Sequence, residues 1–287
     1  MNIHNRTTLG FVGMRRHAGQ PSEPKRRRIV VTYSGSGETE SWPIQHDELQ
    51  SRSSTRPPLQ RSQFCFRHLR AQPFWDPEAA GNDIAALASE LEGEFDAICR
   101  EVRALLAPLN DEEDEEVEDG KGGGQWAPQG EGLHRGIWLR CELWARGKRH
   151  DLNLAKLPVL AAILDGSSAL MRDPPGRCYM SLMTLGTVVA PHSGPTNHRL
   201  RLHLPLTLPT SPTAPLCIKV GNVSRAWERG KVLLFDDSFE HSVELPSAGS
   251  MLQGAVPEPR VLLVADVWHP DAERLVPRDH RTAPLQA

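Results

Sequence analysis

Hydrophobic residues first recur with a regular period between residues 84 and 105. Their spacings of three and four place them on one face of an α-helix; they are Ile84, Leu87, Leu91, Phe95, Ile98, Val102 and Leu105. Ahead of them, Asp76 is a suitable N-cap residue, and Pro77 suits a first helical turn because its missing N–H would have no partner there. The pattern predicts a helix whose apolar face packs on the rest of the protein.

Beyond residue 130 the hydrophobic pattern is that of β-strands. Short apolar runs follow one another with Gly, Pro and Asn between them; they cover residues 136–144, 179–185, 200–206, 217–220, 231–235 and 260–268. No helical period separates them, except that residues 154–164 are compatible with a short helix that Pro158 would weaken. We therefore predict a mainly β fold, a β-sandwich or jelly roll, with helices flanking it on the N-terminal side.

Three other segments lack a sustained hydrophobic period. Residues 1–60 are rich in Ser, Arg, Pro, Thr and Gly and predict a disordered N-terminal arm. The basic cluster at 25–28 within it is a solvated tail or, as the less favoured alternative, a targeting or docking patch. An acidic run followed by glycines predicts a flexible insertion at 110–125. We place one domain at residues 73–278 and a short tail at 279–287.

Composition narrows the class of protein. The chain has 287 residues, 39% of them hydrophobic, and a formal net charge of −3, which is typical of one large domain of a soluble protein. No overall positive field favours nucleic acid as a partner. The five cysteines are widely spaced without a CxxC pair, so we predict neither a disulfide framework nor a zinc knuckle. No stretch reaches the roughly 20 apolar residues of a membrane helix, so we expect no transmembrane segment in this chain.

Candidate chemistry lies in two segments with histidines near predicted strand ends. His192 precedes a turn rich in Gly and Pro, and in the following strand Arg199, Arg201 and His203 alternate with leucines and so share one face. His241 follows an apolar run and an acidic turn. Two imidazoles on neighbouring strands suit Fe(II), and an inward arginine suits a dicarboxylate through paired hydrogen bonds. Because the chain has 12 histidines, any one of them alone is more often structural than a metal ligand.

Five ordered motifs extend this picture. They are His-Ser-Gly-Pro-Thr-Asn at 192–197, Arg-Leu-Arg-Leu-His-Leu at 199–204, Trp-Glu-Arg-Gly-Lys-Val-Leu at 227–233, Phe-Asp-Asp-Ser-Phe-Glu-His at 235–241 and Asp-Val-Trp-His-Pro at 266–270. Together they resemble the catalytic domain of the aspartyl/asparaginyl β-hydroxylase family, and within it the aspartate β-hydroxylase domain-containing proteins. The resemblance implies a double-stranded β-helix. It also implies an enzyme that uses Fe(II), 2-oxoglutarate and O2 to hydroxylate the β-carbon of Asp or Asn in a protein or peptide substrate.

The resemblance also implies roles for individual residues. Two residues match the iron ligands of the family, namely His192 and His241. Four residues match positions that hold 2-oxoglutarate, and a fifth matches a position beside it; they are Trp138, Ser181, Arg201, Arg260 and, beside the cosubstrate, His203.

Two departures from related patterns bear on these roles. Most 2-oxoglutarate oxygenases have a carboxylate ligand two residues after the first histidine, where this chain has Gly194. The resembling family shares this gap and has water at the open coordination position; chloride-dependent halogenation is the less favoured alternative. The connection from His241 to Arg260 is about nine residues longer than is usual in the family, and its composition predicts an extended surface hairpin.

The alternative to an enzyme is a catalytically inactive β-helix that acts as a scaffold or binds metal or peptide, since a fold does not prove a function. The presence of both histidines and the arginines favours the enzyme. The resemblance further implies that full-length forms are anchored in the secretory pathway, at the endoplasmic reticulum, by an N-terminal membrane helix. We expect this chain to lack that helix.

Overall fold

The computed structural model describes residues 8–9, 31–32, 60–63, 65–66, 69–106, 126–130, 132–209, 215–247 and 258–274. The chain divides into two compact units, and in the first, which contains residues 1–57, the described residues form one antiparallel pair, β1 (Thr8–Leu9) with β2 (Val31–Thr32). The fold and site described below belong to the second unit. Three predicted segments lie outside the described residues. They are the arm at 1–60, except for this pair and Gln60, the insertion at 110–125 and the tail at 279–287.

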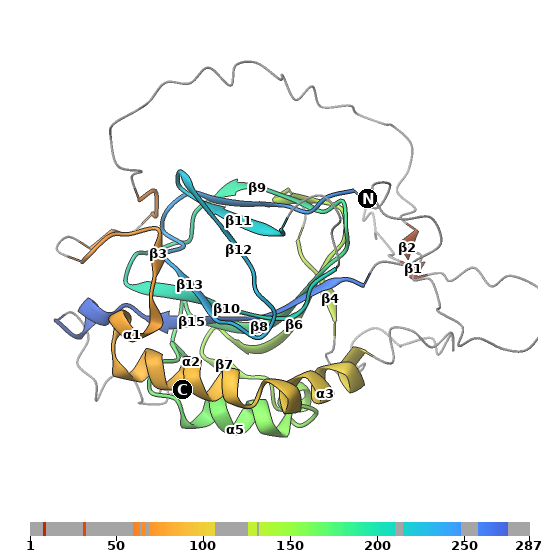
Figure 1. Cartoon of the computed structure of the whole chain (residues 1–287), viewed down its shortest axis with the longest axis horizontal. Helices are drawn as coiled ribbons and strands as arrows, with labels where there is room; N and C mark the ends of the chain where they lie inside the picture. Colours follow the sequence, from red (N-terminus) through yellow and green to blue (C-terminus); the bar gives the residue numbers. More distant parts are fainter. Residues whose placement is uncertain are drawn as a thin grey trace, which may run out of the picture. The chain divides into compact units, whose positions relative to one another are not determined.

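Eight strands in the second half of the chain form two antiparallel sheets (Figure 1). They are β8 (Arg177–Met183), β9 (Val188–His192), β10 (Arg199–Thr207), β11 (Cys217–Val220), β12 (Val223–Ala226), β13 (Leu233–Phe235), β14 (His241–Glu244) and β15 (Arg260–Trp268). The larger sheet contains the order β13-β10-β15-β8, and the smaller sheet the order β12-β11-β14-β9. Successive strands therefore alternate between the sheets, except for the β11–β12 hairpin. This is a double-stranded β-helix, and it confirms the predicted mainly β jelly-roll class.

Short strands extend both sheets at their edges. The larger sheet gains β3 (Phe74–Trp75) beside β13 and β6 (Trp138–Ala145) beside β8, and β6 in turn pairs with β4 (Ala127–Pro128) and β7 (Lys148–Arg149). The smaller sheet gains β5 (His134–Arg135) beside β9. Strand β6 brings Trp138 to the same face as residues of β8, because Trp138 pairs with Met183 in register.

The hydrophobic core lies between the two sheets. Both sheets contribute buried side chains to one cluster, which includes Met183, Val189, Ile218, Phe235, Val243 and Leu262. On β10 the alternation predicted from the sequence is present, since Leu200, Leu202 and Leu204 are fully buried on the face opposite Arg201 and His203. Helices α2 (Asn82–Gly93), α3 (Phe95–Leu106) and α5 (Pro158–Gly166) lie along the outer side of the larger sheet (Figure 1), which explains why that face is apolar as well.

The predicted helical stripe is present but divided. It forms α1 (Pro77–Ala80), α2 (Asn82–Gly93) and α3 (Phe95–Leu106), with Asp76 capping α1 through the backbone N–H of Glu78. Gly81 has a φ of 122°, which side-chain-bearing residues rarely adopt, and it separates α1 from α2. The stripe residues are buried, except for Phe95, which is half-buried.

The short helix considered over 154–164 is present only from Pro158 onward, and no helix runs through this proline. The segment forms α4 (Asp151–Leu154) and α5 (Pro158–Gly166), and Pro158 begins α5, where its missing N–H needs no partner. The next two N–H groups, of Val159 and Leu160, donate to the Glu101 carboxylate of α3 at 2.6 and 3.2 Å. A carboxylate from another helix therefore supplies the N-terminal cap of α5.

Within the described residues, no helix has both the length and the apolar character needed to cross a membrane.

Candidate metal and cosubstrate site

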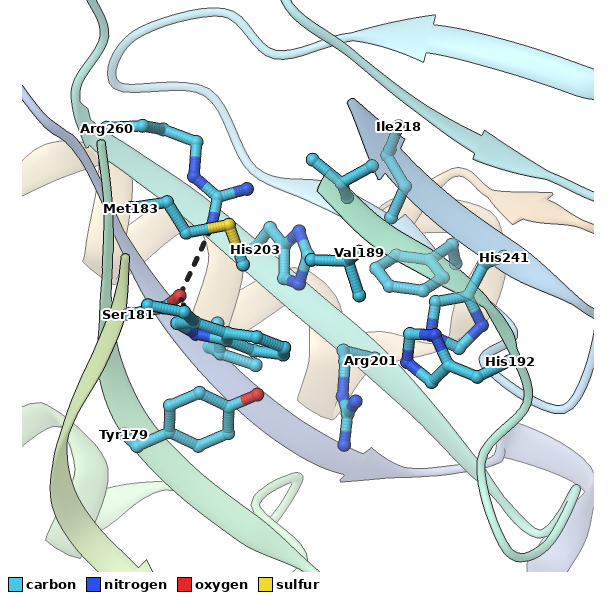
Figure 2. A pocket seen from close by; sticks show the side chains of 14 residues that line it. Tyr179, Ser181, Met183, Val189, His192, Arg201, His203, Ile218, His241 and Arg260 are labelled. Atoms are coloured by element: carbon cyan, nitrogen blue, oxygen red, sulfur yellow. Dashed lines mark hydrogen bonds between the residues drawn. The ribbon is translucent and has the colours of Figure 1, made fainter. Parts of the chain in front are cut away.

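The two histidines singled out from the sequence lie side by side in the smaller sheet. His192 ends β9, His241 begins β14, and the two residues pair in register. Their ring centroids are 4.1 Å apart, and both rings lie at one side of the pocket between the sheets (Figure 2). The prediction of two imidazoles on neighbouring strands is confirmed.

Backbone carbonyl groups fix the orientation of both imidazoles. Nδ1 of His192 lies 2.9 Å from the carbonyl oxygen of Ala190, and Nδ1 of His241 lies 2.9 Å from that of Phe239. A carbonyl oxygen only accepts hydrogen bonds, so each Nδ1 carries the proton and each Nε2 keeps a free lone pair. This is the arrangement by which proteins orient histidines that bind a metal through the other ring nitrogen.

Burial keeps both imidazoles in the neutral form that a metal requires. Desolvation lowers the pKa of His192 below its usual value. The pKa of His241 falls to about 3, first through burial and then through the neighbouring His192. Since only the unprotonated ring binds a metal, protons compete weakly for this pair at neutral pH.

Gly194 has no space for a side chain. A Cβ atom there would lie 2.3 Å from Oδ2 of Asp237, and the Gly194 N–H donates to the Asp237 carbonyl oxygen at 2.6 Å. The buried Asp237 carboxylate thus lies where a side chain of residue 194 would begin. Across the part of the chain that the structure describes, no group of three or more His, Cys, Asp or Glu side chains is placed to hold one metal ion. The site offers two histidines without the carboxylate of a facial triad.

Asp237 belongs to a buried network of two cations and two anions. Its Oδ2 lies 2.6 Å from Nη2 of Arg199 and 3.4 Å from Nη1 of Arg201. Asp266 on β15 completes the network, 2.7 Å from Nη1 of Arg199 and 2.8 Å from Nε of Arg201. Burial opposes ionisation of Asp237, but the two arginines outweigh it and hold the pKa of this carboxyl well below its usual range. The charge of Arg201 is therefore already compensated within the protein.

Arg260 differs from Arg201 in having no counter-ion among the described residues. Its side chain is fully buried, Nη2 donates to Oγ of Ser181 at 3.2 Å (Figure 2), and the guanidinium carbon lies 4.8 Å from the centre of the Trp227 ring. Burial lowers the pKa of Arg260 to about 9. A buried cation without a partner carries a large desolvation cost, which an anionic ligand with paired oxygens would offset.

Ser181 is placed to assist such an anion. Trp138 donates its Nε1–H to Oγ of Ser181 at 3.1 Å, and Arg260 donates to the same oxygen. These two bonds use both lone pairs of the hydroxyl, so its own proton is left to donate. Arg260 and Ser181 together present hydrogen-bond donors of the kind a carboxylate requires.

His203 is held as a neutral donor between the two ends of the pocket. Trp227 donates its Nε1–H to Nδ1 of His203 at 3.2 Å, so the neutral ring carries its proton on Nε2. Burial, followed by the charges of Arg260 and Arg201, lowers the pKa of His203 well below its usual value. The ring therefore stays uncharged beside the two arginines.

All seven residues singled out from the sequence line this one pocket; they are Trp138, Ser181, His192, Arg201, His203, His241 and Arg260. Arg260 lies there, although residues 248–257 of the longer connection lie outside the described residues. Sequence reasoning did not assign Tyr179, which also lines the pocket, or Trp227, which supports His203 and Arg260. Tyr179 could have been found, because it lies two residues before Ser181 on the same face of a strand.

Comparison with known proteins identifies a family. Residues 92–270 match the family model of the aspartyl/asparaginyl beta-hydroxylases. The chain is 35% identical over 226 residues to the aspartyl/asparaginyl beta-hydroxylase of Mus musculus, covering 78% of this chain and 26% of that protein. It is 28% identical over 225 residues to aspartate beta-hydroxylase domain-containing protein 2 of Rattus norvegicus, covering 76% of this chain and 57% of that protein. The matches thus span about a quarter and just over half of these two relatives.

Among solved structures, a prolyl-4-hydroxylase from Pseudomonas putida is similar with a TM-score of 0.34 and 16% identity, covering 62% of this chain and 98% of that chain. A cupin-like protein from Thermotoga maritima is similar with a TM-score of 0.28 and 12% identity, covering 53% of this chain and 82% of that chain.

The strand order and the pocket define a double-stranded β-helix protein with a pair of histidines and a buried arginine between its sheets. The family match, which covers more than half of the chain, identifies it further: this chain belongs to the aspartyl/asparaginyl β-hydroxylase family.

Proposed function

We propose that this chain is an Fe(II)- and 2-oxoglutarate-dependent dioxygenase that hydroxylates the β-carbon of Asp or Asn in a protein or peptide substrate. The observation that carries the proposal is the placement, in one pocket, of two neutral histidines with free Nε2 atoms and one buried arginine without a counter-ion. Family membership supports the same reaction class.

The donor set fits the proposed metal. His192 and His241 would hold Fe(II) through Nε2, because each Nδ1 is bound to a backbone carbonyl group. Two protein ligands leave several coordination positions for 2-oxoglutarate, O2 and water. When bound, Fe(II) with 2-oxoglutarate supplies the oxidation: O2 is consumed, 2-oxoglutarate becomes succinate and CO2, and a substrate C–H becomes C–OH.

The protein's own contribution to this reaction is binding and orientation. Arg260 and Ser181 would hold the carboxylate of 2-oxoglutarate that is distant from the metal, with Trp138 fixing the Ser181 hydroxyl. His203 would donate its Nε2–H without adding charge. Arg201 would line the cosubstrate pocket, but Asp237 and Asp266 already balance its charge. We therefore propose that it would contribute a hydrogen bond to the cosubstrate and no net positive charge.

The proposal is tested by anaerobic titration of the purified chain with Mn(II) and then with 2-oxoglutarate, followed by addition of Fe(II) and O2. We expect one metal site per chain, binding of 2-oxoglutarate that depends on the metal, and formation of succinate in the presence of Fe(II). His241→Ala should weaken Mn(II) binding by at least about tenfold, because one of only two protein ligands is removed.

The same titration decides against the enzyme if the wild-type protein binds neither metal nor 2-oxoglutarate. That result would favour the alternative, an inactive β-helix scaffold. The protein substrate and the membrane anchoring of full-length forms in the secretory pathway stay predictions from the resemblance.

A further inference from the structure

A segment that precedes the β-helix in the sequence lies across both turns that bear the histidines. It consists of residues 60–63, 65 and 66, here called the strap, and it is drawn in orange ahead of β3 in Figure 1. Gln60 and Ser62 are half-buried, whereas Arg61 and Gln63 are exposed, so alternate side chains face the domain as in an edge strand.

On one side the strap binds the turn that leads into His241. Gln60 forms a β-bridge with Phe239, and the Arg61 N–H donates to the Ser238 carbonyl oxygen at 2.7 Å. Phe239 is also the residue whose carbonyl oxygen accepts the Nδ1–H of His241. The strap therefore pairs with the residue whose carbonyl group sets the orientation of the second histidine.

On the other side the strap binds the turn that follows His192. Ser62 donates its hydroxyl to the Gly194 carbonyl oxygen at 2.7 Å, and Ser193 donates its hydroxyl to the Arg61 carbonyl oxygen at 3.1 Å. Further along, Asn197 holds both backbone groups of Phe66, accepting its N–H at 2.7 Å and donating to its carbonyl oxygen at 3.0 Å.

Gln60 joins the two turns directly through its side-chain amide. Its Nε2 donates to Oδ2 of Asp236 at 2.8 Å, and its Oε1 accepts from Nδ2 of Asn197 at 3.1 Å. Asp236 lies in the turn before His241, and Asn197 in the turn after His192. Both partners are buried, so these bonds are shielded from competing water.

We propose that the strap is a positioning element that fixes the two histidine-bearing turns relative to each other, with Gln60 as its central positioning residue. The inference rests on the metal site proposed above. A facial triad defines its geometry through three protein ligands, whereas this site has two, so more of the required order must come from the surrounding backbone. The strap would hold the two turns in place, although it lies more than 120 residues away from either of them in the sequence.

Gln60→Leu in the full chain tests the proposal, because it keeps a similar volume and removes both amide bonds. Ser62→Ala is a milder second variant that removes only the bond to Gly194. The matched control is Arg70→Leu, since the Arg70 side chain forms an exposed ion pair with Asp271 and lies over the Trp75 ring, with no side-chain hydrogen bond to the described residues of either histidine turn. For each protein we would measure Mn(II) affinity, the visible spectrum of bound Co(II), and the free energy of unfolding without metal.

We expect Gln60→Leu to weaken Mn(II) binding about fivefold and to change the Co(II) spectrum, with a smaller change of the same kind for Ser62→Ala. Arg70→Leu should leave both readouts unchanged. The proposal would be overturned if both strap variants kept the wild-type Mn(II) affinity and Co(II) spectrum. It would also be overturned if Mn(II) affinity fell in proportion to the free energy of unfolding in the strap variants and in Arg70→Leu alike. A wild-type chain that binds no Mn(II) would overturn the proposed function itself, and the role of the strap with it.

Discussion

At the scale of single residues, charge compensation distinguishes the two arginines of the pocket. Arg201 shares Asp237 and Asp266 with Arg199, so its charge is balanced inside the protein. Arg260 has one hydroxyl and an aromatic face as partners, and burial lowers its pKa. Arg201 therefore contributes to the fold, whereas we propose that Arg260 serves ligand binding.

This distinction predicts opposite effects of two equivalent substitutions. Arg260→Met should leave the chain without ligands as stable as the wild type or more stable, by about 1 kcal/mol or more, because an uncompensated buried cation is removed. Arg201→Met should destabilise it by about 3–5 kcal/mol, because two buried carboxylates lose a partner. Urea unfolding without metal measures both values. Equal losses in the two variants would contradict the assignment of Arg260 to an external anion.

Gly194 gives a second prediction at this scale. Gly194→Ala should cost roughly 1–3 kcal/mol of unfolding free energy, because the new Cβ would meet the Asp237 carboxylate at 2.3 Å. Gly166→Ala is the control, since nothing lies within 4 Å of a Cβ there and the residue ends a helix. Urea unfolding of the two variants provides the measurement. Equal stabilities would show that the Asp237 side chain does not fill the space beside residue 194.

At the scale of elements, the strands with long apolar runs could be predicted and the short polar strands could not. The runs near 200–206 and 260–268 correspond to β10 and β15, which lie at the centre of the larger sheet. Strands β12 and β14 have few consecutive apolar residues, because many of their side chains are exposed or half-buried. His241 was expected at the end of one strand and lies at the start of the next for this reason.

The helical elements show the same limit. The spacing of hydrophobic residues predicted which face of α2 and α3 is buried. It did not predict the break between the two helices at Glu94, because the same spacing continues across the break. The N-terminal cap of α5 depends on Glu101, more than 50 residues earlier in the chain, which no local pattern indicates.

This cap is testable through stability alone. Glu101→Ala should lower the unfolding free energy by about 1–2 kcal/mol, because two N–H groups at the start of α5 lose their acceptor. Glu90→Ala, at an exposed position of α2, is the control and should change it by less than about 0.5 kcal/mol. Mn(II) affinity should be the same in both variants, since neither residue lies in the pocket. Equal unfolding free energies of the two variants would show that Glu101 does not cap α5.

At the scale of the whole molecule, the site combines parts that the sequence could and could not indicate. The histidines and the polar face of β10 follow from local alternation and the motif resemblance. Other contacts arise where segments distant in the sequence meet. They are the ion pairs of Arg199 and Arg201 with Asp237 and Asp266, and the hydrogen bond from Trp227 to His203. Such contacts require the strand order, which the sequence pattern leaves open.

The buried imidazoles also predict how stability without metal depends on pH. An unfolded histidine has a pKa near 6.5, whereas that of His241 is about 3 in the fold, so below pH 6.5 the unfolded state binds the extra proton. As the pH is lowered from about 6 to about 4, the free energy of unfolding should therefore decrease more steeply in the wild type than in His241→Gln. The difference in slope should be about 1.4 kcal/mol per pH unit. Asp236, whose pKa burial raises to about 6, acts in the opposite direction but equally in both proteins. Parallel pH profiles would contradict burial of a neutral His241.

The central claim is that metal and 2-oxoglutarate meet in one pocket, the metal on the histidines and the cosubstrate on Arg260. Electron paramagnetic resonance of the Mn(II)-loaded chain, with and without 2-oxoglutarate, tests it most directly. We predict that 2-oxoglutarate changes the Mn(II) spectrum of the wild type, and that Arg260→Met keeps the wild-type spectrum of bound Mn(II) but loses the response to 2-oxoglutarate at the same concentration. A spectrum that 2-oxoglutarate leaves unchanged in the wild type, or changes equally in Arg260→Met, would contradict the account.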